Sequence, residues 1–577
     1  MKTIYPFCLT AFFLTFTSIH QAQNFDWAVQ IEGVSPAAAN SNSYDVETDA
    51  QGNVFIAGTF VGQVKFGSQT LESTGIVPGA LPDGFIAKFS ASGAFEWVEQ
   101  IPASLDAKVR DIELDAAGNI FFAADIFGVA SFGGTSAGVE GDRGIVVGKL
   151  NPDRELQWMQ SFISESNNEP VFIHSLELGA NGDLYISGDF EGDMNLGGIQ
   201  LDAGAESRFF LARLNQDEGD VFWASVHGIS LPLDPGSDVA TDFSSNVYFT
   251  GSTIGNSDFG GIAVDATDER TFVLVKFDST GAAQWLRRSH GESLNLEDRG
   301  EGVAVHPSSG EVYVAGTFIS DTFDIAGLKL FRSGFCCQNF FIAKFSPAGD
   351  ILWAKQSHGP APQAEGRDIE VDDAGDAYAT GIYGEPATGG AIPLEVTLGE
   401  GGQAVLLENT GYLDIFLAKY SNSGSLLWAK RASGTEADYV TSLALAGMGN
   451  AAITGTFNET FTVGSQTFMA TPTPATDNMF VAFCDGDLSG VGNRLSRTAR
   501  LVLSPNPASD MVKVEIQSEI TLKGWVELLN ANGVVLRRSD IGSVPVEFST
   551  NGLPEGIYFI RLATDKGSLA EKLVLGK

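Results

Sequence analysis

An all-β fold is what this sequence predicts, and three observations predict it. Seven tryptophans recur at intervals of 61 to 75 residues. Each interval holds four short runs of β-branched and aromatic residues bounded by Gly, Asp, Asn or Ser, and the first and last intervals are incomplete in complementary ways. Repeated four-stranded units form β-propellers, so we expect a seven-bladed β-propeller closed by an N-terminal strand, followed by a small Ig-like β-sandwich. The recurring residues are Trp27, Trp97, Trp158, Trp223, Trp285, Trp353 and Trp428.

The first repeat shows the order of the elements. A tight Asp-x-x-Gly-Asn turn joins the first two strands, a long polar connection follows, and a tight Ser-x-x-Gly turn joins the last two. The predicted elements are the strand 43–48, the turn 49–53, the strand 54–60, the strand 85–89, the turn 90–93 and the strand that carries Trp97. The repeat exceeds the roughly 40–45 residues of a WD-type blade, and the excess lies after the second strand.

Later repeats copy these elements. The first turn recurs at 115–119, 180–183 and 372–376, the second strand at 188–190, 316–318 and 455–457, and the third strand at 341–345 and 416–420.

The two ends of the repeat region complete each other. The strand 26–29 carries a tryptophan but has no third strand before it, whereas the strand 480–484 has no tryptophan strand after it. If the first completes the last blade, the ring closes without a free edge. We divide the chain into a signal peptide at 1–22, a seven-bladed propeller at 23–488, a linker at 489–499 and a C-terminal domain at 500–577.

Successive connections in a four-stranded blade alternate between the two faces of the ring. The two tight turns therefore fall on one face, and the long connections after the second and fourth strands fall on the other. Long loops on a rigid scaffold are where recognition usually lies. We therefore expect the ligand on this long-loop face.

The charge excludes some partners. The formal net charge is −38, and such a field repels nucleic acid and anionic lipid. Lys2 and the apolar stretch 4–19 read as a secretory signal with cleavage after Ala22. No later segment offers 18 uncharged apolar residues, so we expect no membrane span. An extracellular location follows.

Three cysteines remain after the signal, too few for a disulfide framework. The adjacent pair Cys336 and Cys337 either closes a strained vicinal disulfide or stays as thiols, and Cys484 is the third. They lack the spacing of a thiolate metal site. We expect no metal site and no cofactor.

Two repeated patterns have structural explanations. Asp49, Asp115 and Asp372 resemble calcium ligands but lack the alternating oxygens and closing Glu of an EF-hand loop, so each is expected to cap its turn. A cation recurs in the third strand, and we expect it to pair with a first-strand aspartate such as Asp111 or Asp368. The recurring cations are Lys88, Lys149, Arg213, Lys276, Lys344 and Lys419.

Three histidines are the candidate ligand-binding residues. His227, His290 and His358 follow successive tryptophans by four or five residues, and each precedes Gly. They fall on the predicted long-loop face, where they are either loop residues or a metal or proton-transfer site. No nucleophile elbow, P-loop or His-Glu-x-x-His motif is present, so we assign no catalytic residue.

Residues 25–488 resemble a bacterial β-propeller repeat family, the SBBP type, whose units read Gly-x-Asp-Ile-x-x-Asp-x-x-Gly-Asn-x-Tyr-x-x-Gly. The segment 367–381 is a near copy, while 443–450 has lost both acidic positions. The resemblance implies an extracellular protein.

The tail is similar to the type A C-terminal sorting domain of the type IX secretion system. The similarity rests on the segments 504–508, 526–533, 553–558 and 572–577. It implies an Ig-like sandwich that the secretion machinery reads and often removes. The sorting-motif residues it implies are Pro505, Asn506, Pro507, Gly533, Gly556, Tyr558 and Lys572.

These observations favour a secreted or cell-surface binding or adhesion module for a glycan, protein or matrix ligand, exported by the type IX system. The alternative is an extracellular polysaccharide-degrading enzyme, a lyase or glycosidase, on the same scaffold. An enzyme predicts a deep pocket with converging His, Tyr, Arg or acidic groups. A binder predicts a shallow face that bears aromatic residues, and a structural role predicts self-association.

Overall fold

The computed structural model describes most of the chain as β-strands. The described residues are 25–34, 41–74, 81–165, 169–230, 237–265, 270–291, 298–333, 338–359, 363–384, 395–447, 449–470, 478–484, 499–518, 523–530, 535–541, 546–554, 556–564 and 567–576. The predicted signal peptide 1–22, the linker residues 489–498 and both cysteines of the 336–337 pair lie outside them. Among the described residues no helix is both long and apolar enough to cross a bilayer.

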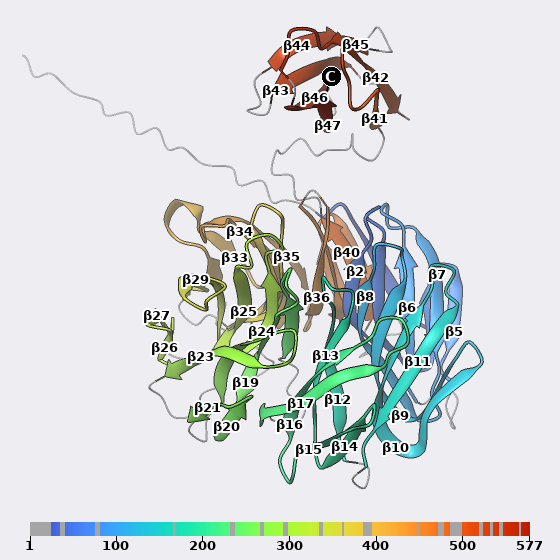
Figure 1. The fold of residues 1–577 in the computed structure, drawn as a ribbon, viewed down its shortest axis with the longest axis vertical. Helices are drawn as coiled ribbons and strands as arrows, with labels where there is room; N and C mark the ends of the chain where they lie inside the picture. Colours follow the sequence, from blue (N-terminus) through green and yellow to red (C-terminus); the bar gives the residue numbers. More distant parts are fainter. Residues whose placement is uncertain are drawn as a thin grey trace, which may run out of the picture.

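The propeller strands form antiparallel four-stranded units (Figure 1). The first strand of each unit contacts the first strands of the neighbouring units, so these strands are innermost. In the described residues these units, in order, are β2 (Asn42–Thr48), β3 (Val54–Phe60), β6 (Asp83–Phe89) and β7 (Phe95–Ile101); β8 (Asp106–Leu114), β9 (Ile120–Phe132), β10 (Thr135–Leu150) and β11 (Leu156–Ile163); β12 (Val171–Leu178), β13 (Leu184–Phe190), β16 (Arg208–Leu214) and β17 (Val221–Ile229); β18 (Asp238–Thr241), β19 (Val247–Thr253), β22 (Thr271–Phe277) and β23 (Ala283–Gly291); β24 (Arg299–Val305), β25 (Val312–Phe318), β28 (Asn339–Phe345) and β29 (Ile351–Gln356); β30 (Ala364–Val371), β31 (Ala377–Gly384), β34 (Leu413–Tyr420) and β35 (Leu426–Gly434); and β36 (Tyr439–Ala446), β37 (Asn450–Phe457), β40 (Asn478–Cys484) and β1 (Trp27–Gly33).

The N-terminal strand lies beside the C-terminal strand of the repeat region. Trp27 pairs with Phe483 and Ile31 with Met479, so β1 is the fourth strand of the sheet that contains β40. The rings of Trp27 and Phe483 stack with their centroids 5.5 Å apart.

The hydrophobic core lies between neighbouring sheets. The second strands β3, β13, β19 and β25 are buried at every residue, as expected for strands covered on both faces. One apolar cluster joins Phe55 and Ile86 of the first sheet to Val109, Phe122 and Val146 of the next. Each sheet is therefore held by packing against both neighbours.

The long connection after the second strand contains a further β-hairpin, which the sequence analysis expected as loop. The described hairpins are β4 (Gln63–Phe66) with β5 (Gln69–Glu72), β14 (Asp193–Leu196) with β15 (Ile199–Asp202), β20 (Asn256–Phe259) with β21 (Ile262–Asp265), β26 (Thr322–Ile325) with β27 (Leu328–Phe331), β32 (Val396–Leu398) with β33 (Val405–Leu407) and β38 (Thr460–Val463) with β39 (Gln466–Met469). The 3-10 helix η2 (Gly401–Gln403) lies between β32 and β33. Three hairpins pair with the outer strand of the preceding sheet: β4 with β1, β26 with β23 and β38 with β35. The hairpins account for the length of the repeat.

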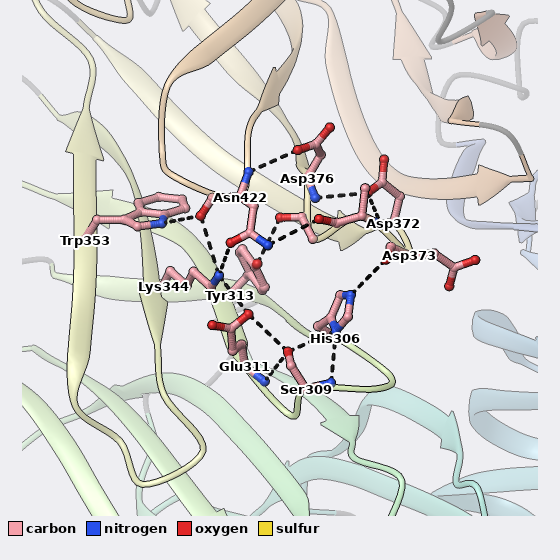
Figure 2. A network of polar contacts seen from close by, with 12 residues as sticks. His306, Ser309, Glu311, Tyr313, Lys344, Trp353, Asp372, Asp373, Asp376 and Asn422 are labelled. Carbon is pink, nitrogen blue, oxygen red and sulfur yellow. Dashed lines mark hydrogen bonds and ion pairs between the residues drawn. The ribbon is translucent and has the colours of Figure 1, made fainter. Parts of the chain in front are cut away.

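Five of the recurring tryptophans link their sheet to the next one by a hydrogen bond. Five indole Nε1–H groups donate to a backbone carbonyl in the tight turn between the last two strands of the following sheet, at 2.9–3.2 Å. Figure 2 shows one such contact, from Trp353 to the carbonyl of Asn422. The glycine of that turn lies against the ring, since a Cβ on Gly93 would come within 2.7 Å of Trp27. The donors are Trp27, Trp158, Trp223, Trp285 and Trp353.

The aspartate turns are as predicted. The Asp49 carboxylate accepts the backbone N–H groups of Gln51 and Asn53 at 2.9 Å each, and Gly52 has φ of 78°. Asp115 and Asp372 cap their turns in the same way.

The predicted partners of the third-strand cations are wrong. The cations pair with acids of the tight turns, as in Lys419 with Asp372 at 3.0 Å. Figure 2 shows a second such pair, Lys344 with Glu311 at 2.8 Å. Asp111 and Asp368 could not be their partners because these side chains lie on the innermost strands and line the central channel.

The tail forms two sheets that share one apolar core. Val512 and Val514 from one sheet and Val526 and Leu528 from the other are fully buried in it. The first sheet contains β41 (Ala499–Ser504), β42 (Met511–Ser518) and β45 (Val546–Ser549), and the second contains β44 (Val535–Asp540), β43 (Gly524–Asn530), β46 (Gly556–Thr564) and β47 (Gly567–Leu575).

Candidate functional site at the mouth of the central channel

The innermost strands enclose a cavity of about 520 Å³. Every sheet contributes to its wall through its first strand or the residue just before that strand. The cavity lies at the end of the channel where these strands begin. The long connection after each fourth strand leads into the start of the next first strand, so this end of the channel is on the long-loop face.

A β-bulge places one side chain of each strand at this mouth. In six of the innermost strands the register slips at one residue, which has no partner across the ladder. A bulge redirects a side chain without ending the strand. The six residues, with Ser237 at the corresponding place before β18, all line the cavity, and we call them the mouth residues. They are Tyr44, Arg110, His174, Ser237, Glu301, Arg367 and Thr441.

Ion pairs hold the arginines of the mouth. Arg110 Nε donates to the Asp125 carboxylate at 2.7 Å, and its guanidinium lies 4.3 Å from the centroid of the Tyr44 ring. Burial raises the pKa of Tyr44, so this phenol stays protonated at neutral pH. Arg367 donates to Glu365 at 2.9 Å. Both arginines are therefore oriented donors.

His174 is held by a buried carboxylate. Its Nε2 hydrogen-bonds to Asp189, whose side chain is 2% exposed. Asp189 also accepts from the hydroxyl of Ser207 at 2.8 Å and from that of Ser230 at 3.4 Å. A carboxylate in this position fixes the orientation of the imidazole, and His is the side chain whose ordinary pKa allows proton transfer near neutral pH.

Directly after the mouth residue, four of the innermost strands carry an aspartate that lines the channel. We call Asp45, Asp111, Asp238 and Asp368 the Asp ring. Each accepts a hydrogen bond from a backbone N–H of the next sheet, at 2.7–2.9 Å. Serines replace aspartate at two further positions, where Ser175 accepts from the N–H of Val239 at 3.4 Å and Ser442 from that of Val46 at 3.3 Å. The side chains of the Asp ring therefore link neighbouring innermost strands by hydrogen bonds.

The fifth sheet interrupts this pattern. Its residue is Gly302, and a Cβ there would come within 3.1 Å of the Asp368 carboxylate. Asp368 accordingly accepts the N–H of Ile369 at 2.7 Å. Because Gly302 has no side chain, the Asp368 carboxylate can occupy the space beside it.

A second set of acids follows two residues later. We call Glu47, Glu113, Glu177 and Glu370 the Glu ring. With the Asp ring it lines a further cavity of about 180 Å³. Burial raises the pKa of all four, that of Glu177 to about 7. It also raises the pKa of the four Asp-ring carboxyls, that of Asp238 to about 6.

The carboxyl groups of the rings also act on one another. After burial, the strongest cause that raises the pKa of Glu47 and Asp111 is the charge of Asp45, and for Glu113 it is the charge of Glu177. Because burial and like charge both disfavour ionisation, these carboxyl groups keep their protons to a higher pH than isolated ones do.

The three histidines of the sequence analysis lie on or just after the outer strands of successive sheets. His227 is buried against Phe259 and Phe277, and burial lowers its pKa to about 4. His290 lies opposite Asp324 in β26, and His358 pairs through its backbone with Thr397. Burial lowers the pKa of both. The described contacts link each histidine to its own surroundings and not to another of the three.

The mouth residues and the two rings were not among the predicted site residues, although the sequence carries a signal for them. Four innermost strands share the order mouth residue, ring residue, apolar residue and Glu. These are Tyr44-Asp-Val-Glu47, Arg110-Asp-Ile-Glu113, His174-Ser-Leu-Glu177 and Arg367-Asp-Ile-Glu370. Within the described residues no group of three or more His, Cys, Asp or Glu side chains is placed to hold a metal ion. The described thiol, Cys484, is free and buried.

Of the residues predicted for the sorting motif, Asn506 contacts the last strand of the tail. The side-chain oxygen of Asn506, between Pro505 and Pro507, accepts the N–H of Val574 at 2.9 Å. Tyr558, on β46 after Gly556, is 6% exposed and donates its hydroxyl to the carbonyl of Pro554 at 3.0 Å. Lys572 lies on β47 opposite Phe559. Gly533 falls outside the described residues.

The tail matches a known family. Residues 503–576 match the secretion system C-terminal sorting domain. This match indicates secretion to the cell surface or the exterior, and it implies interaction with the type IX secretion machinery. The chain thus combines a β-propeller with a sorting domain for export.

Similarities over the rest of the chain are remote. An uncharacterized WD repeat-containing protein of Acanthamoeba polyphaga mimivirus is 19% identical over 75% of this chain, which spans 36% of that relative. The WD40 domain of Neurospora crassa Pan2 is 8% identical, with a TM-score of 0.38 over 81% of this chain and 98% of that one. BamB from Moraxella catarrhalis is 10% identical, with a TM-score of 0.32 over 80% of this chain and 99% of that one.

Proposed function

We propose that this protein is an exported β-propeller binding module that takes an extracellular glycan or protein ligand at the mouth of its central channel. The observation that carries the proposal is the cavity of about 520 Å³, walled by all the innermost strands and lined by oriented polar groups. A pre-formed cavity with a few convergent polar groups is the usual form of a ligand site.

Aromatic and polar groups are both available to a ligand there. Tyr439 lines the cavity and is 39% exposed, and Tyr44 and Phe172 line it too. Flat aromatic faces bind apolar surfaces of sugars and side chains, while Arg367 and Glu301 offer hydrogen bonds of opposite polarity. Because these groups stand on strands, binding requires little ordering.

The finer architecture belongs to the same proposal. It has seven blades at 23–488, closed by the N-terminal strand and related to the SBBP-type repeat, then the linker 489–499 and an Ig-like sandwich at 500–577. The pairing of β1 with β40 supports closure, and the shared core of the two tail sheets supports the sandwich.

The test uses two tyrosines matched in exposure. Tyr439 is 39% exposed at the mouth, and Tyr412, which is 37% exposed, does not line the cavity. The secreted chain and the two alanine variants are screened against arrayed polysaccharides and extracellular proteins. Tyr439→Ala should weaken capture about tenfold or more, as loss of a central aromatic does, and Tyr412→Ala should leave it unchanged. Equal capture by both variants would contradict a site at the mouth.

One observation favours a second function, a polysaccharide-degrading lyase or glycosidase. The mouth brings His174, oriented by Asp189, into a cavity that Tyr44 and Arg110 also line. Such a set can move protons. Cleavage products from the array that disappear with His174→Ala, while capture persists, would establish this function. Capture without products from the wild type would exclude it for those substrates.

The outer-strand histidines stay a separate prediction. If the long loops bind the ligand, substitution of His227, His290 or His358 should weaken capture more than Tyr439→Ala does. The burial of His227 and its lowered pKa are better suited to packing than to ligand contact.

A further inference from the structure

The central channel has a strong excess of acidic groups. The larger cavity is lined by the Asp ring and Glu301 against two arginines, Arg110 and Arg367. Those arginines already pair with Asp125 and Glu365. Among the described residues, the smaller cavity is lined by both rings and by no lysine or arginine. The negative charge of the two rings must therefore be neutralised by protons or by bound cations.

A buried hydroxyl in the wall also lacks a partner in the described part of the chain. Ser237 is 4% exposed and lines the larger cavity beside Asp238. Its Oγ makes no hydrogen bond to any of the described residues. A buried hydroxyl without a partner costs free energy, and a ligand with N–H groups in this cavity would restore the missing bond.

The arrangement of the carboxylates selects the kind of cation. They are spread around the channel, and no three of the described ones converge on a point where one metal ion could sit. The Asp ring lines both cavities and so forms the boundary between them. The two rings are two residues apart along each strand, which is about 6.5 Å. An ammonium group on a short alkyl chain spans such a distance and can donate to several carboxylates at once.

We propose that the central channel binds an ammonium group carried on a flexible aliphatic chain, the chemistry of a free polyamine or of a lysine side chain. The inference rests on the proposed function and names the ligand group that enters the mouth. The ammonium lies between the carboxylates of the Asp ring and those of the Glu ring, the alkyl chain lies against Tyr44 and Tyr439, and Ser237 Oγ accepts one N–H.

Cation binding must then displace protons. A bound ammonium favours the ionised form of the carboxyl groups, so it lowers their pKa and releases protons from the rings. Affinity should rise between pH 5 and pH 8. Arg110 and Arg367 at the mouth oppose the cation at all these pH values, and His174 opposes it only when it is protonated.

The experiment is calorimetric titration of the full secreted chain with spermidine and with a tetralysine peptide at low salt. Each titration is run in two buffers of different ionisation enthalpy, which counts released protons. The test variant is Glu370→Gln, because Gln has the shape of a protonated Glu and so preserves the fold. The matched control is Glu400→Gln, whose side chain is 63% exposed and outside both cavities.

We expect binding with proton release, weakened about tenfold or more by Glu370→Gln and unchanged by Glu400→Gln. Binding of spermidine alone would support a small amine as the ligand, and binding of tetralysine would support a protein partner. Equal binding of a tetraglutamate peptide, or equal loss in both variants, would overturn the inference. If neither amine binds but an array ligand is captured in a Tyr439-dependent manner, the inference fails and the proposed function stands.

Discussion

Replacing one aspartate of the channel should change how stability depends on pH. Burial raises the pKa of Asp238 from 3.8 to about 6. Because the folded pKa is above the unfolded one, the stabilisation from this group is fully present below about pH 4 and is lost as pH rises through about 6. Two pKa units correspond to about 3 kcal/mol. Asp238→Asn cannot ionise at this position and does not lose this stabilisation. The difference in free energy of unfolding between the variant and the wild type should therefore shift by about 3 kcal/mol in favour of the variant from pH 4 to pH 8.

The assay is urea unfolding of both chains at pH 4, 6 and 8, followed by tryptophan fluorescence. Asn cannot accept both the Val303 N–H and the Ser175 hydroxyl as Asp238 does. That loss is nearly independent of pH and cancels in the comparison across pH. Asp278→Asn is the control of opposite sign, because hydrogen bonds from Thr280 lower the pKa of Asp278. An Asp238→Asn difference that stays constant from pH 4 to pH 8 would refute the buried carboxyl.

Three further predictions concern the scaffold and export. Trp285→Ala should destabilise the propeller by roughly 3–5 kcal/mol, because it removes both packing and the hydrogen bond to Pro347; an unchanged melting curve would contradict this. Gly93→Ala should cost at least about 1–2 kcal/mol, since φ is 81° and the new Cβ would meet Trp27, and a melting temperature equal to the wild type's would exclude that contact. Deletion of residues 500–577 should leave the propeller folded, as judged by circular dichroism, but absent from the cell surface and medium, and normal display would disprove the sorting role.

The sequence predicts the repeated scaffold because each repeat carries its own local signals. The tryptophans, the Asp and Ser turns and the buried second strands each recur at a fixed place, so one repeat explains the others. The hairpin β4–β5 was harder to predict, because its two strands are four residues each and its polar residues resemble a loop. Its signal in the sequence was the alternation of the apolar residues Val64 and Phe66, both of which are buried, with polar neighbours.

The repeated four-residue order could have marked these residues, but it could not show that they line one channel, because they meet only in the folded propeller. Asp45 and Asp111 are far apart in the chain, yet both line the same two cavities. A bulge also changes which side chain faces the channel, and the alternation of a regular strand does not reveal a bulge. The partners of the third-strand cations were wrongly predicted for the same reason. The sequence does not show that Asp111 lies on an innermost strand and lines the channel, where it cannot pair with these cations.

Photo-crosslinking of a captured ligand tests the central claim most directly. A photoreactive amino acid is placed at position 439 in one chain and at position 412 in another, and each is irradiated with the ligand that the array identifies. A ligand seated in the channel mouth predicts a crosslink from position 439 and none from position 412. A crosslink from position 412 alone would place the ligand on the outer loops and contradict the account.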